Sequence, residues 1–426
     1  MPHAATTLIL SAETASAEPL AQDGGEPVIN EEQTPQAPLR WGAPELEELR
    51  TMLEHRSLFY WKHPAVEKLT ERFRRHYPLE HVMPTSSGTA SIHVALCAAG
   101  LAPGDEVITT PVTDMGTVIG ILYQQAVPVF ADLDGRTYNL DPASVEAAIT
   151  PRTKAIVAVH LTGNPCDMNA LGRIAKNHKL VLIEDCAQAW GTKYDGRPIG
   201  TIGDIACYSF NDFKHISCGD GGIVATNNAA YGPLLQRFGD KGYDRVTGSH
   251  SSEVLAPCYR MSAPQAAVAA PQMDRMENIA ANRNRLGNRL CSLLGEIPGI
   301  LPQKVRPQDF STYWFTMFRR EPGCFRGTRD EFVKALQAEG LPAGAGYIPI
   351  PVYQYKAFRE ANFFGGRWPL RETGMTSMDY NNVSCPEAER ILQDAVRLEV
   401  KEWMTEDYMR LSAQAVAKVA SHFRQS

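Results

Sequence analysis

The chain has 426 residues, of which 44% are hydrophobic and 21% are charged, a composition typical of a globular protein with room for two folded units. Its formal net charge of −6 gives the protein no general basic character, so nucleic acid is not an expected partner.

The first predicted segment is polar. Residues 1–36 are rich in Ala, Glu, Gln, Pro and Gly and show no periodicity, which predicts a disordered N-terminal tail. Residues 43–56 and 64–76 then show the apolar spacing of helices. From residue 85 to about 227 helix-like and strand-like pieces alternate. The expected helices are 89–100, 117–125, 142–149 and 167–178, and the expected strands are 106–110, 127–132, 154–161, 180–184, 205–210 and 223–226.

Near-continuous apolar strands joined by helices predict an α/β fold with a mostly parallel sheet covered on both faces. The rest of the chain reads as a smaller α/β unit that follows a helix rich in Ala and Arg. The preceding helix is expected at 263–297, and the expected elements of the smaller unit are a strand at 312–319 and helices at 329–339, 387–397 and 405–423. We therefore expect a large domain at 37–280 and a small C-terminal domain at 281–426.

The nine cysteines form no CxxC pair, which favours reduced thiols in a cytoplasmic protein and predicts no metal site. No apolar run approaches the roughly 20 residues of a membrane span, so a membrane is not an expected partner. The first 24 residues lack the basic start of a secretion signal.

Lys214 carries the strongest chemical signal. It follows Ser209 by five residues and precedes a glycine-rich turn at 219–222, while Asp185 ends an apolar run. A lysine can form an imine with an aldehyde cofactor, and a carboxylate can keep a pyridine nitrogen protonated. Pyridoxal 5'-phosphate (PLP) needs this pair, so Lys214 and Asp185 are the expected catalytic residues.

The remaining expected PLP contacts are supplied by short polar motifs. Gly88 and Thr89 open a predicted helix and suit a phosphate, to which Ser209 adds a hydroxyl. Gln188 follows Asp185 by three residues and suits the ring hydroxyl. Each residue alone also has an ordinary interpretation, such as a helix cap, a loop amide or a surface lysine. The ordered set favours the cofactor.

The ordered set resembles the DegT/DnrJ/EryC1/StrS family of sugar aminotransferases, which are PLP enzymes of fold type I. The matching segments are Ser87–Ser91, Pro103–Ile108, Ile149–Ile156, Val159–Leu161, Glu184–Ala189, Ser209 with Phe210 and Lys214, and Gly221–Gly222. The resemblance implies a large domain with a seven-stranded sheet, a Schiff base on Lys214, and a homodimer with active sites at the subunit interface. It also implies ping-pong transfer of an amino group from glutamate or glutamine to a keto-sugar or keto-cyclitol, in amino-sugar, cell-surface glycan or secondary-metabolite biosynthesis.

Two departures from the family pattern leave alternatives open. Asp114 and Met115 stand where the family often places an aromatic ring, and Cys258 replaces an asparagine that reaches the neighbouring subunit's phosphate. One alternative is a PLP-dependent sugar dehydratase. The resemblance implies that the dehydratases of this family have a histidine at the position of the lysine. Here His215 stands beside the retained lysine. The other is a non-catalytic regulatory or binding protein on the same scaffold.

Overall fold

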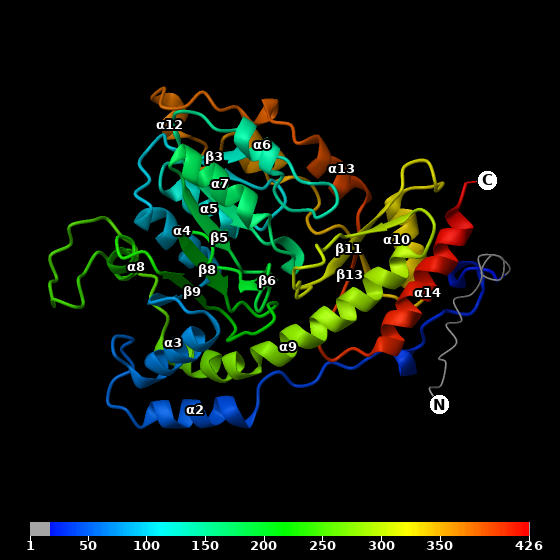
Figure 1. Ribbon diagram of the computed structural model, residues 1–426, viewed down its shortest axis with the longest axis horizontal. Coiled ribbons are helices and arrows are strands. Elements are labelled where there is room, and N and C mark those ends of the chain that lie inside the picture. The colour runs from blue at the N-terminus through cyan, green and yellow to red at the C-terminus, as the bar shows by residue number, and fades with distance from the viewer. Residues whose placement is uncertain (1–17, 426) are drawn as a thin grey trace.

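The computed structural model describes residues 18–425 and contains the expected α/β architecture, a central sheet with helices around it (Figure 1). The central sheet has seven strands in the order β1-β9-β8-β5-β4-β2-β3. They are β1 (His81–Thr85), β2 (Glu106–Thr109), β3 (Val127–Phe130), β4 (Thr153–Val159), β5 (Val181–Asp185), β8 (Ile205–Ser209) and β9 (Gly222–Thr226). Neighbouring strands from β3 to β8 run parallel, and only the pairs that include β9 are antiparallel. The expected mostly parallel sheet is confirmed.

β1 is the strand of this sheet that the sequence did not predict. It lies at the edge of the sheet and contains Pro84, a residue that edge strands tolerate because it donates no ladder hydrogen bond.

In the described part of the chain up to residue 280, eight helices surround this sheet. They are α2 (Ala43–Leu53), α3 (Pro64–His76), α4 (Gly88–Ala98), α5 (Gly116–Tyr123), α6 (Pro142–Ala147), α7 (Met168–His178), α8 (Gly232–Gly239) and the first half of α9 (Ala263–Gly295). Helices α2, α3 and α9 pack together below the sheet, and α4 packs against β8 and β9 (Figure 1). A small hairpin, β6 (Lys193–Tyr194) and β7 (Arg197–Pro198), follows β5.

The second unit is built on an antiparallel sheet of four short strands in the order β10-β11-β13-β12. The strands are β10 (Ile300–Pro302), β11 (Thr316–Arg320), β12 (Ala343–Ala345) and β13 (Val396–Leu398), and the helices of the C-terminal region are α10 (Arg329–Ala338), α11 (Lys356–Arg359), α12 (Pro369–Glu372), α13 (Pro386–Asp394) and α14 (Glu406–Phe423). The helix expected at 387–397 ends earlier, because Ala395 is extended and leads into β13.

The long helix α9 joins two hydrophobic cores. Met276 belongs to the core of the large sheet, whereas Leu286 belongs to the core of the second unit. The chain returns to the first core between Val352 and Ala395. The boundary at residue 280 falls inside α9, and the proposed division into domains 37–280 and 281–426 stays a prediction.

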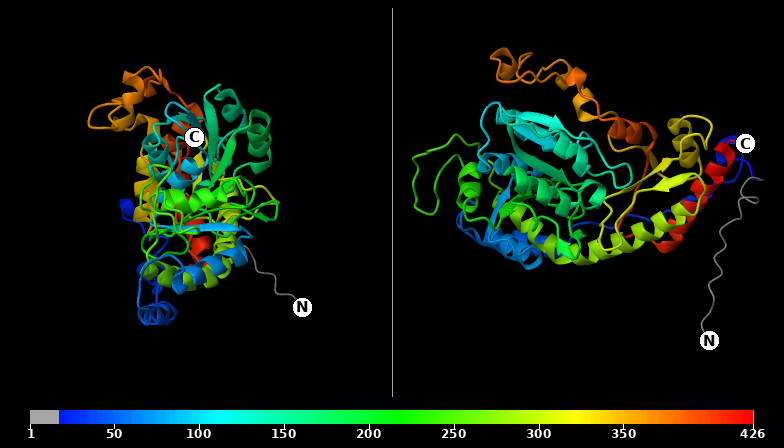
Figure 2. Two further views of the ribbon diagram at one scale, coloured as in Figure 1. Left: turned by 90° about the vertical axis from the view of Figure 1, so that its left-hand side faces the viewer. Right: turned by 45° about the horizontal axis from the view of Figure 1, so that its top comes forward.

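Residues 18–42, which we call the N-terminal strap, run beside α9 from the second unit to α2 (Figures 1 and 2). Leu20 and Ile29 are buried in the second core. The buried Glu339 carboxylate accepts hydrogen bonds from the Ala21 and Val28 amides at 2.8 and 3.1 Å. These contacts correct the expected disordered tail for residues 18–36, while residues 1–17 lie outside the described residues.

None of the helices within residues 18–425 combines the length and the apolar composition needed to span a membrane.

Candidate active site

The expected catalytic and cofactor-binding residues surround one cavity of about 340 Å³. Its walls include all six of them: Gly88, Thr89, Asp185, Gln188, Ser209 and Lys214. Asp185 is the last residue of β5 and Ser209 the last of the parallel strand β8, so both lie at the carboxyl edge of the sheet. Ligands of open α/β sheets bind at this edge.

The start of α4 forms one side of the cavity. The Ser87 hydroxyl accepts a hydrogen bond from the Ala90 amide at 3.1 Å, which caps the helix. The first amides of an α-helix have no partner within it and face an incoming anion. Glycine is required at position 88 because an added Cβ would lie 2.7 Å from Ser209 Cβ.

Asp185 is held by two donors inside the cavity. Its carboxylate accepts hydrogen bonds from the Thr117 hydroxyl at 2.9 Å and from the Ala187 amide at 3.1 Å. Burial raises the pKa of Asp185, and these hydrogen bonds together with the charge of Lys214 oppose that rise. A cationic ring nitrogen near this carboxylate would favour its ionised form.

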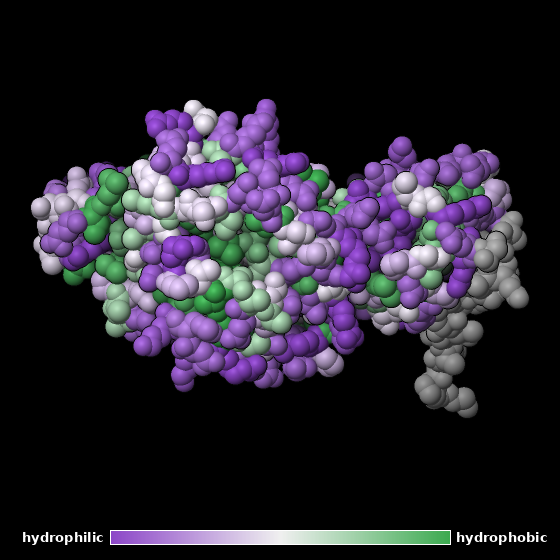
Figure 3. All heavy atoms as spheres, turned by 90° about the horizontal axis from the view of Figure 1, so that it is seen from above, coloured by the Kyte–Doolittle hydropathy of each residue, from purple (hydrophilic) through white to green (hydrophobic). Residues whose placement is uncertain are grey.

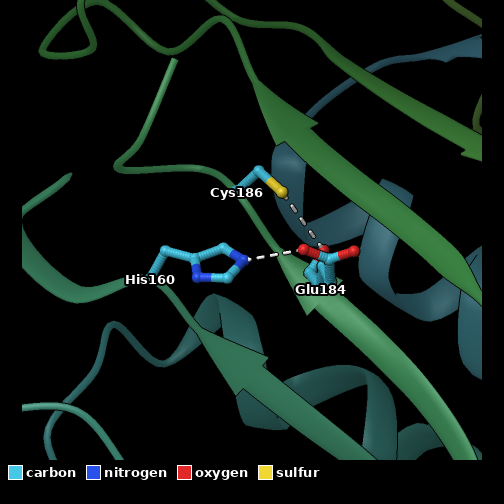
Figure 4. Close-up of side chains that lie close together, drawn as sticks. All are labelled: His160, Glu184 and Cys186. Atoms are coloured by element: carbon cyan, nitrogen blue, oxygen red, sulfur yellow. Dashed lines mark hydrogen bonds and ion pairs between the residues drawn. The ribbon is translucent and has the colours of Figure 1, made fainter. Parts of the chain in front are cut away.

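Glu184 and Cys186, the two chain neighbours of Asp185, form a buried cluster with His160 (Figure 4). The Cys166 amide donates to His160 Nδ1 at 3.1 Å, so a neutral His160 carries its proton on Nε2, 3.1 Å from Glu184 Oε2. Glu184 also accepts hydrogen bonds from three backbone amides, those of Gly200, Ile202 and Gly203. Its oxygens are therefore occupied, and the cluster anchors the end of β5 rather than offering open metal ligands.

Gln188 is positioned from both ends of its amide. The Thr162 amide donates to Gln188 Oε1 at 3.0 Å, and Gln188 Nε2 donates to the Tyr347 hydroxyl at 3.3 Å. Gln188 thus links the first cavity to Tyr347, which lines a second cavity.

Lys214 stands between this cavity and a second one of about 420 Å³. Burial lowers the pKa of the Lys214 amine to about 8, against the opposing charges of Asp185 and Asp114. A lysine with this pKa has a useful fraction of its nucleophilic, uncharged form near neutral pH.

The second cavity is closed by residues of the second unit that the sequence did not identify. Trp314 and Phe315 precede β11, and Arg397 lies on β13. The complete wall is Asp114, Asn211, Phe213, Lys214, Trp314, Phe315, Tyr347, Arg397, Glu399 and Lys401. Asp114 lines both cavities, as its position in the sequence suggested, whereas Met115 lies outside both walls.

The backbone around Lys214 is held by side chains distant in sequence. The Arg40 guanidinium of the strap donates to the carbonyl groups of Asp212 and Lys214. Trp314 Nε1 donates to the Phe213 carbonyl at 2.6 Å, and Trp41 Nε1 donates to the Ser217 carbonyl at 3.3 Å. The loop that carries the lysine is therefore fixed by both the strap and the second unit.

Two other residues singled out in the sequence lie away from the cavities. His215 is buried, and its Nε2 lies 3.2 Å from the Thr312 carbonyl oxygen, outside both cavity walls. Burial lowers the pKa of His215 well below its ordinary value. Cys258 is exposed and pairs with Asp240 in an isolated bridge.

The sequence matches the model of the DegT/DnrJ/EryC1/StrS aminotransferase family over residues 41–416. It is 33% identical to the spore coat polysaccharide biosynthesis protein SpsC of Bacillus subtilis (strain 168), over 76% of this chain and 86% of SpsC. It is 34% identical to a Micromonospora echinospora protein assigned as an L-glutamine:3-amino-2,3-dideoxy-scyllo-inosose aminotransferase, over 88% of this chain and 90% of that protein.

The fold is similar to solved structures over nearly the whole chain. The crystal structure of 3-amino-5-hydroxybenzoic acid (AHBA) synthase superimposes with a TM-score of 0.81 at 27% identity, covering 92% of this chain and 99% of that chain. These similarities and the geometry of the cavities indicate the same enzyme family.

Proposed function

Because the chain belongs to the DegT/DnrJ/EryC1/StrS aminotransferase family, we propose that it uses PLP to transfer an amino group from glutamate or glutamine to a keto-sugar or keto-cyclitol. The observation that carries this proposal is that Lys214 and Asp185 line one cavity beside the start of α4. The names of the relatives, a polysaccharide biosynthesis protein and an inosose aminotransferase, support an acceptor of this class in amino-sugar or secondary-metabolite biosynthesis.

The residues of the first cavity fit the phosphate, the ring and the aldehyde group of PLP. Gly88, Thr89 and Ser209 would hold the phosphate, because helix amides and hydroxyls converge there. Asp185 would pair with the ring nitrogen, and Gln188 would contact the ring. Lys214 would carry the aldehyde carbon.

PLP, when bound, links an amine through an imine and withdraws electrons from the carbon next to that amine. The protein has to supply positioning and proton transfer. Lys214 Nζ would take the proton from the donor's α-carbon as a general base and return a proton as a general acid. Its burial favours the uncharged amine that begins this cycle. The keto acid of the donor would leave before the acceptor enters, in a ping-pong order.

Two alternatives receive less support from the site. A dehydratase would need a histidine in the position of the lysine, yet His215 lies outside both cavities and Lys214 lies between them. A non-catalytic binding protein would have no use for a lysine amine whose pKa is lowered beside a buried carboxylate.

The family resemblance supports a homodimer. Apolar side chains are exposed on α2 and the turn after it, among them Leu46, Leu53 and Phe59. Hydrophobic residues also gather toward the middle of the upper face of the larger lobe, whereas the smaller lobe is mostly hydrophilic (Figure 3). Light scattering on the purified protein tests whether it is a dimer.

The nine free thiols support the proposal of a cytoplasmic location.

The function is tested by adding L-glutamate or L-glutamine to the PLP-loaded protein and following the cofactor absorbance. We expect the band to change with one of these donors and to stay unchanged in Lys214→Ala. Mass spectrometry of products from a panel of keto-sugars and keto-cyclitols then identifies the acceptor. A wild-type protein that shows no change with any amino donor would contradict the proposal.

A further inference from the structure

A third cavity, of about 490 Å³, is lined by residues of both units, and we call it the junction cavity. Its walls come from the loop after β3, from α9 and from the residues in and around β10 and β11. It shares no wall residue with the two cavities of the candidate active site. A space of this volume accommodates a small organic molecule.

Three cations and no acid of the described chain line the junction cavity. Arg136 follows β3, whereas Lys304 follows β10 and Arg319 lies on β11. The side chains of Arg136 and Lys304 are exposed and have no hydrogen-bond or ion-pair partner among residues 18–425. Arg319 pairs with Glu387 at 2.8 Å, but Glu387 also pairs with Arg390, so one carboxylate serves two arginines. In a protein whose formal net charge is −6, this local excess of positive charge favours an anionic ligand.

Hydrogen bonds within the protein fix the backbone that carries these cations. The Lys304 amide donates to the Arg136 carbonyl at 2.8 Å, so the two units meet between these residues. The Arg136 amide donates to the Asp134 carboxylate at 3.0 Å, and Arg319 Nη2 donates to the Gly135 carbonyl at 2.6 Å. A ligand that contacts both units would therefore bind a preorganised segment and order few residues, which favours affinity.

The walls also keep hydrogen-bond donors for such a ligand. Arg319 Nε is buried and makes no hydrogen bond within the described chain. The Ser292 hydroxyl, exposed on α9, has no partner there either. Guanidinium and ammonium groups bind phosphate oxygens strongly, and a hydroxyl both donates to and accepts from the hydroxyl groups of a ligand. The donor set thus suits a phosphate group attached to a hydroxyl-rich body.

We propose that the junction cavity binds the phosphate monoester of a sugar or cyclitol, with the phosphate between Arg136 and Lys304. This site is separate from the proposed aminotransferase site. Because its cations come from both units, the bound ligand would hold the loop after β3 against the segment that follows β10.

Calorimetry on the PLP-loaded protein tests the ligand class with D-glucose 6-phosphate, inorganic phosphate and D-glucose as probes. We expect saturable binding of D-glucose 6-phosphate and at least about tenfold weaker binding of inorganic phosphate, which lacks the hydroxyl-rich body. D-Glucose lacks the charge and should show no measurable binding.

Variants of the two exposed cations test the place of binding. Arg136→Gln and Lys304→Gln should each weaken the binding of D-glucose 6-phosphate by about 10- to 100-fold, because each removes a charged hydrogen bond to the phosphate. Both side chains are exposed, so the variants should fold normally. Two controls should bind like the wild type: Lys401→Gln, in the wall of the second cavity, and the exposed Arg326→Gln, outside all three walls.

Hydrogen exchange locates the ligand without any substitution. Saturating D-glucose 6-phosphate should slow exchange in peptides spanning 134–138 and 300–305 and leave the lysine loop at 210–217 unchanged. Protection confined to 210–217 would overturn the inference, as would affinity lost in Lys401→Gln but kept in Arg136→Gln and Lys304→Gln. Absence of binding in the wild type, or equal affinity for inorganic phosphate, would overturn it too. None of these results depends on the aminotransferase reaction.

Discussion

The ammonium nitrogen of Lys214 lies 3.9 Å from the centre of the Trp314 ring. The same indole donates its N–H to the carbonyl of Phe213, the residue before the lysine, at 2.6 Å. A residue of the second unit therefore contacts both the amine and the backbone of the lysine loop. The electron-rich ring face favours the charged amine, whereas burial favours the uncharged one.

Replacing Trp314 by leucine should lower the pKa of Lys214 by about one unit, because the apolar cover is kept and the ring face is lost. Competitive acetylation of the cofactor-free protein across pH, with mass spectrometry of the Lys214 peptide, measures this pKa. Trp314→Phe keeps a ring and is the control. A higher pKa in the leucine variant would indicate that Trp314 acts mainly by excluding water.

The lowered pKa of Lys214 predicts a specific pH dependence of stability. The unfolded lysine has the ordinary value of 10.5 and the folded one about 8, so between these values the unfolded state binds more protons and stability rises with pH. Relative to Lys214→Met, the cofactor-free wild type should gain about 2 kcal/mol between pH 8 and 10.5. This is less than the full shift, because the side chain keeps some contact with water.

Urea unfolding of both proteins at several pH values across this window checks the gain. Other titrating groups are common to the two proteins and cancel in the difference. A constant difference across the window would mean that the lysine titrates normally in the folded protein.

Gly88→Ala should weaken PLP binding at least about tenfold and destabilise the protein by about 1–3 kcal/mol, since its Cβ would overlap Ser209. Fluorescence titration with PLP and thermal unfolding measure the two effects. Gly172→Ala in α7 is the matched control, because an added Cβ there meets nothing within 4 Å. It should raise stability by about 0.5–1 kcal/mol. Normal PLP affinity in Gly88→Ala would argue against a phosphate site at this helix start.

Arg40→Gln should loosen the lysine loop without changing either cavity wall. The arginine donates to the carbonyls of Asp212 and Lys214, and losing these charged hydrogen bonds should make local opening about tenfold more frequent. Hydrogen exchange of the peptide spanning 210–217 measures this, with the exposed Arg56→Gln as the control. Unchanged exchange in Arg40→Gln would show that the other contacts suffice.

The parts of the site that the sequence predicted are those encoded by local patterns. Asp185 ends an apolar strand, Ser209 ends the next parallel strand and Lys214 follows it, so the topology of the sheet brings them together. Trp314 and Arg397 could not be placed in this way. They belong to a different unit, and Arg397 lies on a strand of only three residues that periodicity assigned to a helix.

The strap escaped prediction for a related reason. Leu20 and Ile29 are among the few large apolar residues in a polar stretch and form no repeating pattern. Their burial depends on Glu339, more than 300 residues later in the chain, whose carboxylate satisfies the amides of Ala21 and Val28. A buried acceptor of this kind leaves no local signal in the segment that it holds.

The strap also shows that the residues that border the reaction chamber differ from those that support its lysine loop. A version of this chain shortened to begin at residue 42 would retain every side chain that borders either hollow, yet the turn bearing the reactive amine would lose two of its external supports, Arg40 and Trp41. Removing an N-terminal segment that borders neither cavity can thus impair an enzyme whose active-site side chains are all intact.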